Sequence, residues 1–125
     1  MMHSRKLLLI RIGIWAVLGF FFLFLFSYST SPLYAISWGH DSAVFQSIGK
    51  GWSKGYIPYL DSFDHKGPLL FALNALGYII GGKNGLFILQ LLFMTAFLEV
   101  SYQTFHLFLN WRLSMPLPVV MLVIL

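Results

Sequence analysis

The sequence has no cysteine and very little charge. The absence of cysteine excludes disulfide bonds and thiolate metal sites. Charged residues make up only 10% of the 125 positions and hydrophobic residues 58%, whereas a soluble domain carries roughly 25% charged residues. The net charge of +4 is dispersed and forms no basic face of the kind that binds nucleic acid. This composition predicts an all-α integral membrane protein whose partners include membrane lipids and no nucleic acid.

Acidic residues are absent from the first forty positions, which instead hold Arg5, Lys6 and Arg11. An apolar run over about residues 12–28 follows these three. The run is longer than the apolar region of a signal peptide, and no clean cleavage site follows it, so we expect an uncleaved signal-anchor helix. Positive residues stay cytoplasmic, which predicts a cytoplasmic N-terminus and an external segment over about residues 29–85.

Two further apolar stretches differ in length. Leu86–Leu109 is long enough to cross a bilayer and ends at Asn110-Trp-Arg112, which is typical of a cytoplasmic boundary. Pro68–Ile80, closed by the glycine-rich 81–85, covers only about 20 Å of a hydrocarbon core of roughly 30 Å. We therefore expect residues 68–80 to form an interfacial or half-inserted helix that does not span. This arrangement also places Arg112 inside.

A last apolar stretch runs from about residue 116 to Leu125 and is too short to span, because a span needs about 20 residues. We interpret it as a truncated third span, and residues 1–125 as the N-terminal transmembrane module of a larger protein. The alternative is a small protein with a tucked-in hydrophobic tail.

Residues 39–68 concentrate the polar chemistry of the chain. They hold three of the four acidic residues, two of the four histidines and three of the eight basic residues. Asp41–Lys54 has the pattern of a short amphipathic helix lying on the membrane surface, and a loop follows at Gly55–Tyr59. Asp41 would lie near the positive end of that helix dipole. A carboxylate there can act as a general base on an acceptor hydroxyl, although it can also be a helix cap or a solvated side chain.

The segment Asp61-x-x-Asp64-His65-Lys66-Gly67-Pro68 ends at a helix start. A lysine at that place can meet a lipid phosphate, and the first N–H groups of the helix add to the anion site. Asp64 and His65 are candidates to orient Lys66 or an acceptor, and a charge-balanced solvated turn is the alternative. The oxygen-rich set would suit a hard divalent cation, but no tight ligand spacing is present.

Glu99 lies in the middle of the span predicted over 86–109. An ionisable residue at such depth is a functional candidate. Gln103 and His106 follow at spacings of four and three, so the three side chains share one helix face. The alternative, which we favour, is inward packing of Glu99 against helices outside this chain.

Together these features resemble the N-terminal module of the GT-C superfamily of polytopic membrane glycosyltransferases, which includes protein mannosyltransferases and lipid A aminoarabinose transferases. His40-Asp41-Ser42 takes the place of the external acidic motif after the first span. His65-Lys66-Gly67-Pro68-Leu69-Leu70 takes the place of the Lys/His-Pro-Pro-Leu-like motif. Ser42 stands where many members have Glu, and Gly67 replaces the first proline. The resemblance covers roughly residues 10–110.

The resemblance implies that Asp41 is the catalytic base and that Lys66 binds the phosphate of a polyprenyl-phosphate-sugar donor, with His40, Asp61, Asp64 and His65 in support. It implies a hexosyl- or pentosyltransferase of a bacterial plasma membrane, with no certain cofactor. The competing prediction is a small non-enzymatic membrane protein, such as a flippase or accessory subunit for lipid-linked sugars. A flippase places polar residues within its spans, whereas here they gather outside.

Overall fold

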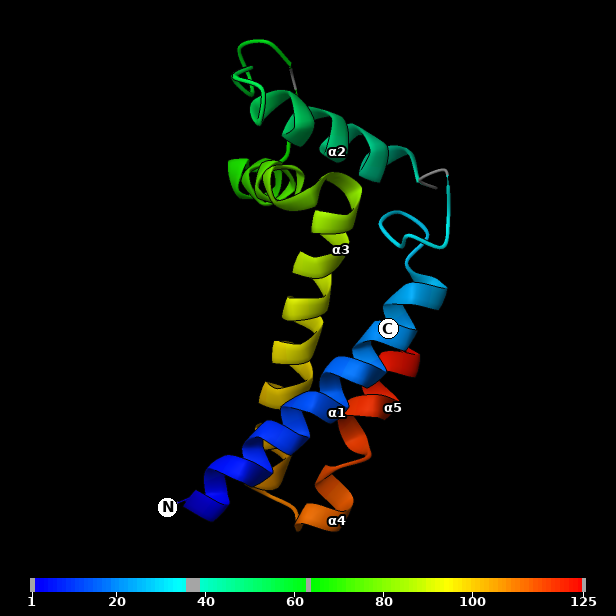
Figure 1. The fold of residues 1–125 in the computed structure, drawn as a ribbon, viewed down its shortest axis with the longest axis vertical. Helices are drawn as coiled ribbons and strands as arrows, with labels where there is room; N and C mark the ends of the chain where they lie inside the picture. The colour runs from blue at the N-terminus through cyan, green and yellow to red at the C-terminus, as the bar shows by residue number, and fades with distance from the viewer. Residues whose placement is uncertain (1, 36–38, 63, 125) are drawn as a thin grey trace. The chain divides into compact units, whose positions relative to one another are not determined.

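The computed structural model describes residues 2–35, 39–62 and 64–124. About 74% of the described residues are helical, and they contain no strand, only an isolated bridge between Pro58 and Ser62. The helices in chain order are α1 (Met2–Phe26), α2 (His40–Trp52), α3 (Pro68–His106), α4 (Trp111–Ser114) and α5 (Leu117–Ile124), as labelled in Figure 1. The chain divides into two compact units, residues 21–90 and residues 1–20 with 91–125. The predicted all-helical class is confirmed.

Two helices are long and apolar enough to cross a membrane, and they account for most of α1 and α3. The apolar run of α1 was predicted to begin near residue 12, but the helix already begins at Met2. Arginine, lysine and leucine are good helix formers, so the basic N-terminal residues continue the helix of the apolar run. The helix ends at Phe26, close to the predicted end.

A sharp break divides α3 at Gly81 and Gly82, whose backbone angles are not helical. Gly82 has φ 61° and ψ −134°, a conformation essentially restricted to glycine, whereas Gly81 is extended at φ −176°. The segment 68–80 is turned away from the segment that begins at Lys83 (Figure 1). A separate short helix over 68–80 is therefore confirmed. Within the glycine-rich segment 81–85, only Gly81 and Gly82 are non-helical, and the helix resumes at Lys83.

The inside of this bend is closed by a second pair of glycines. A Cβ atom on Gly85 would collide with the carbonyl oxygen of Gly77, and a Cβ atom on Gly77 would lie 3.1 Å from the Cα of Leu86. Only glycine at both positions allows the helical segments before and after the break to approach this closely. Lys83 then donates a hydrogen bond to the backbone carbonyl of Tyr34, which joins the bend to the segment after α1.

Helix α2 crosses the segment 68–80 at Gly49. A Cβ atom there would lie 2.8 Å from the backbone nitrogen of Ala75, so the two backbones touch. The rings of Phe45 and Phe71 lie 6.3 Å apart on one side of this point, and Tyr78 reaches Gln46 at 3.5 Å on the other. The helix predicted over 41–54 is confirmed, and its apolar stripe packs on the first segment of α3.

The other unit is built around Trp15 and Leu98, both almost fully buried. Gly19 allows α1 to lie close to α3, since a Cβ atom there would be 3.2 Å from the Cγ of Met94. Asn110 then caps α4 by accepting the N–H of Leu113 at 3.2 Å. The end of α3 at His106 lies three residues before the predicted limit, and the Asn110 cap fixes the start of α4.

Candidate functional site

Asp41 is the second residue of α2 and lies in its first turn, two residues after Gly39, whose φ is positive at 108°. Its side chain is exposed. Within the described ranges, the Asp41 carboxylate accepts no hydrogen bond and forms no ion pair. A capping aspartate would accept a backbone N–H of the first turn, so the geometry disfavours the cap alternative. The carboxylate is instead presented to the surroundings at the positive end of the helix dipole.

The backbone of Lys66 is held from two sides. The Asp64 Oδ1 accepts its N–H at 3.0 Å, which forms a tight turn, and the hydroxyl of Tyr59 donates to its carbonyl at 2.5 Å. No carboxylate of the described chain lies within ion-pair distance of the Lys66 ammonium group. The lysine thus has a defined backbone and an uncompensated charge, two residues before α3 begins at Pro68.

The remaining predicted site residues have unequal surroundings. His65 is largely exposed, and its Nδ1 lies 3.6 Å from Asp64 Oδ1. Asp61 is occupied in its own loop, where Oδ2 accepts the N–H of Ile57 at 2.7 Å. His40 is the first residue of α2 and is exposed. The structure therefore joins Asp64, His65 and Lys66 in one turn, while no bond links that turn to Asp41.

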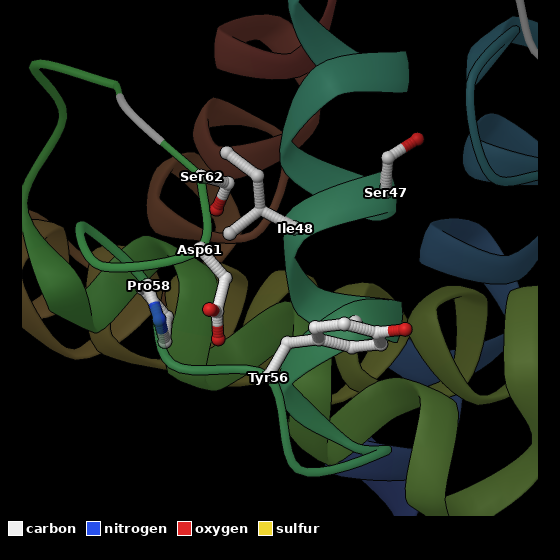
Figure 2. A pocket seen from close by; sticks show the side chains of 7 residues that line it. Ser47, Ile48, Tyr56, Pro58, Asp61 and Ser62 are labelled. Atoms are coloured by element: carbon white, nitrogen blue, oxygen red, sulfur yellow. The ribbon is translucent and has the colours of Figure 1, made fainter.

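The loop over residues 56–62 contains functional candidates that the sequence did not reveal. Tyr59 adopts φ 70°, the only positive φ of a described residue other than glycine. Its ring packs on Phe71 at 5.8 Å between centroids. Tyr56 and Ser62 line a hollow beside α2 together with Asp61 (Figure 2). The sequence Tyr-Ile-Pro-Tyr marks the loop, but the pairing of Tyr59 with α3 has no signal in it.

A divalent cation has no evident place among the described residues, since no three histidine, aspartate or glutamate side chains come together there. Asp64 and His65 are neighbours, but Asp61 is bonded elsewhere. The possibility of a bound cation stays a prediction.

A second polar cluster surrounds Glu99, in the unit formed by residues 1–20 and 91–125. Arg11 donates to both carboxylate oxygens, Nε to Oε2 at 2.8 Å and Nη2 to Oε1 at 2.5 Å. The indole of Trp15 donates to Oε2 at 3.0 Å, and the amide of Gln103 to Oε1 at 2.8 Å. The Arg11 guanidinium also lies 4.2 Å from the centroid of the Tyr102 ring. Each oxygen of the Glu99 carboxylate therefore accepts two hydrogen bonds from side chains of this chain.

This cluster corrects one expectation. The partner of Glu99 was expected outside the chain, but it is Arg11 of α1. A long apolar segment seldom buries an acid without a cation, and that rule was the signal for a partner on α1. His106, predicted on the same face, stacks on Tyr102 at 5.5 Å and does not reach the carboxylate. Glu99 therefore joins α1 to α3.

No protein-family model, no curated protein and no solved structure matches the chain.

Proposed function

We propose that this chain serves in a membrane glycosyltransferase of the GT-C type, with α1 and the part of α3 after Gly82 as membrane spans. The polar segment between them, with α2 and residues 68–80, lies on the outer surface of a bacterial plasma membrane. The proposal draws on the length and apolar character of the two helices and on the predicted cytoplasmic N-terminus. The resemblance of the two motifs around Asp41 and Lys66 supplies the reaction class.

The observation that carries the proposal is the difference between the aspartates. Asp61 and Asp64 each accept a backbone N–H, whereas Asp41 is exposed with no hydrogen bond in the described part of the chain. A general base needs an oxygen that is accessible to the hydroxyl it deprotonates. Of these three carboxylates, Asp41 meets this requirement best.

In the proposed reaction, Asp41 takes the proton of an acceptor hydroxyl as the oxygen attacks the anomeric carbon of the donor sugar. The bond from that carbon to the phosphate oxygen breaks, and polyprenyl phosphate leaves with the bonding electron pair. The ammonium group of Lys66 faces the departing phosphate and stabilises its charge. The turn at Asp64 and Tyr59 holds the backbone from which Lys66 extends.

The proposal is tested with Asp41→Asn in membranes that contain the complete protein and a polyprenyl-phosphate sugar. Asparagine keeps the size of the side chain but is no base. Turnover should fall by about 10²–10⁴-fold, the usual contribution of general-base catalysis. Asp41→Glu, which keeps the carboxylate, should retain part of the turnover that Asp41→Asn loses. Wild-type turnover in Asp41→Asn would show that Asp41 is not the base, and the proposal would then fail.

A further inference from the structure

Two adjoining hollows lie beside α2 and are bordered by α2 and by the loop over residues 56–62. One hollow, of about 190 Å³, is bounded by Tyr56, Pro58 and Asp61. The other, of about 350 Å³, extends from His40 along α2. Ser47, Ile48 and Ser62 border both, so they form a continuous groove, which we call the α2 groove. Neither Asp41 nor Lys66 lines the groove, although His40 and Asp61, which were predicted to support them, do.

The α2 groove is preorganised by bonds within its own loop. The N–H of Ile57 donates to the Asp61 carboxylate, and the N–H of Asp61 donates back to the Ile57 carbonyl at 2.9 Å. The N–H of Tyr59 donates to the carbonyl of Ser62 at 2.8 Å. Tyr59 keeps a positive φ of 70° in this loop. Such a conformation persists only where the surroundings impose it, and it is frequent at binding sites.

The groups that face the groove have a definite chemistry. Figure 2 shows the Asp61 carboxylate between Pro58 and Tyr56, and the Ser62 hydroxyl beside Ile48. Tyr56 is 60% exposed, so its side chain is accessible to a ligand. Gly51 lies beneath that ring, with a hypothetical Cβ atom 3.6 Å from it. A mostly apolar lining with a few fixed polar groups is typical of a small-molecule site.

We propose that the α2 groove binds a saccharide ring. An exposed aromatic face suits the C–H face of a sugar, and a fixed carboxylate with a neighbouring hydroxyl suits its hydroxyl groups. Because Asp61 uses Oδ2 for the loop, Oδ1 is the oxygen left for the ligand. The inference deepens the proposed transferase and depends on it for the ligand class. The saccharide can be the sugar of a polyprenyl-phosphate donor or a free acceptor glycan.

The test uses the complete protein in nanodiscs with methyl α-mannopyranoside and methyl β-arabinopyranoside as probes, a hexose and a pentose. Saturation-transfer NMR should detect at least one of them bound to the wild type. Tyr56→Ala, which removes the aromatic face, and Asp61→Asn, which replaces a charge-assisted hydrogen bond with a neutral one, should each weaken binding about 10-fold. Tyr56→Phe keeps the ring and should bind as the wild type does. Tyr28→Ala, at an exposed tyrosine outside the groove, is the matched control.

Competition distinguishes the two sources of the saccharide. Displacement of the methyl glycoside by polyprenyl-phosphate mannose, but not by polyprenyl phosphate, identifies the donor sugar as the occupant. Displacement by neither assigns the groove to a free glycan. Equal displacement by both would show that the lipid phosphate, and not a saccharide, occupies the groove, and would overturn the inference.

Two further results would overturn it: no saturation transfer from the wild-type protein to either glycoside, or unchanged binding in both Tyr56→Ala and Asp61→Asn. Asp41→Asn separates this inference from the proposed reaction. If Asp41→Asn keeps turnover while the groove variants lose glycoside binding, the Asp41 base fails and the saccharide site stands. If Asp41→Asn loses turnover while the groove variants bind the glycoside normally, the saccharide site fails and the Asp41 base stands.

Discussion

At the scale of the residue, three aspartates of one short segment have different surroundings. Asp61 and Asp64 stabilise local turns by accepting backbone N–H groups, whereas Asp41 is exposed at the positive end of α2. The sequence spacing cannot separate these roles, because each aspartate is followed by residues that allow either a turn or a helix start. Asp61→Asn and Asp64→Asn keep an oxygen acceptor, so they preserve their turns. Asp41→Asn removes the negative charge and the basicity of the side chain and breaks no hydrogen bond in the described part of the chain.

Lys66 provides a second prediction at this scale. If its ammonium group contacts the donor phosphate, Lys66→Met should weaken donor binding by roughly 10- to 150-fold, since a hydrogen bond to a charged group contributes about 1.5–3 kcal/mol. Lys66→Arg keeps the charge and should recover much of the loss. Affinities for the donor and for the same polyprenol without phosphate are compared by equilibrium binding.

Lys54→Met is the matched control, because Lys54 is an exposed lysine in the loop after α2. It should leave both affinities unchanged. An equal loss for both ligands in Lys66→Met would mean that Lys66 supports the turn before Pro68 and does not contact phosphate.

At the scale of the element, the break in α3 depends on one glycine of a pair. Gly82 has φ 61° with ψ −134°, so Gly82→Ala should lower the free energy of unfolding by about 1–3 kcal/mol. Gly81→Ala should be tolerated, because φ −176° suits any residue and no atom lies within 4 Å of a Cβ there. Thermal unfolding in detergent measures both variants. Equal stability of the two variants would show that the bend does not require a residue with a positive φ at position 82.

The same break defines a topology prediction. The segment 68–80 covers about 20 Å and the segment 83–106 about 36 Å, so only the second spans a core of roughly 30 Å. Cysteines introduced at Ser53 and at Asn84 should both react with an impermeant thiol reagent from outside. Residues 1–125 contain no cysteine, so this part of the protein gives no background labelling. Labelling of Asn84→Cys from the cytoplasm alone would show that residues 68–80 span.

At the scale of the whole molecule, the bond between Arg11 and Glu99 joins positions 88 apart in the sequence. Arg11→Met leaves an uncompensated carboxylate and should destabilise the protein by about 3 kcal/mol, at the lower end for a buried pair because the side chain is 21% exposed. Arg11→Met with Glu99→Met should recover most of the stability. Arg5→Met, at an exposed arginine of the same helix, is the control. Similar losses in the single and double variants would mean that the pair contributes little.

Composition and hydrophobic pattern predicted the longer helices, because these depend on local propensity and on long apolar runs, but they did not predict the short helix α4. The all-helical class, α2, the start of α3 at Pro68 and the break at Gly81 follow from residues close together in the sequence. The pattern also identified the polar segment that holds Asp41 and Lys66. It did not predict how tightly the bend closes, because the contact of Gly85 with Gly77 depends on how two helical segments meet.

Only the tertiary structure decided which side chains distant in the sequence contact each other. Arg11 meets Glu99 because α1 lies against α3, and Tyr59 meets Lys66 because the loop after α2 folds onto the start of α3. The α2 groove likewise exists only once Tyr56 and Ser62 lie beside Ile48. Such pairings depend on packing between segments distant along the chain, and a pattern of neighbouring residues carries no information about which distant side chain completes them.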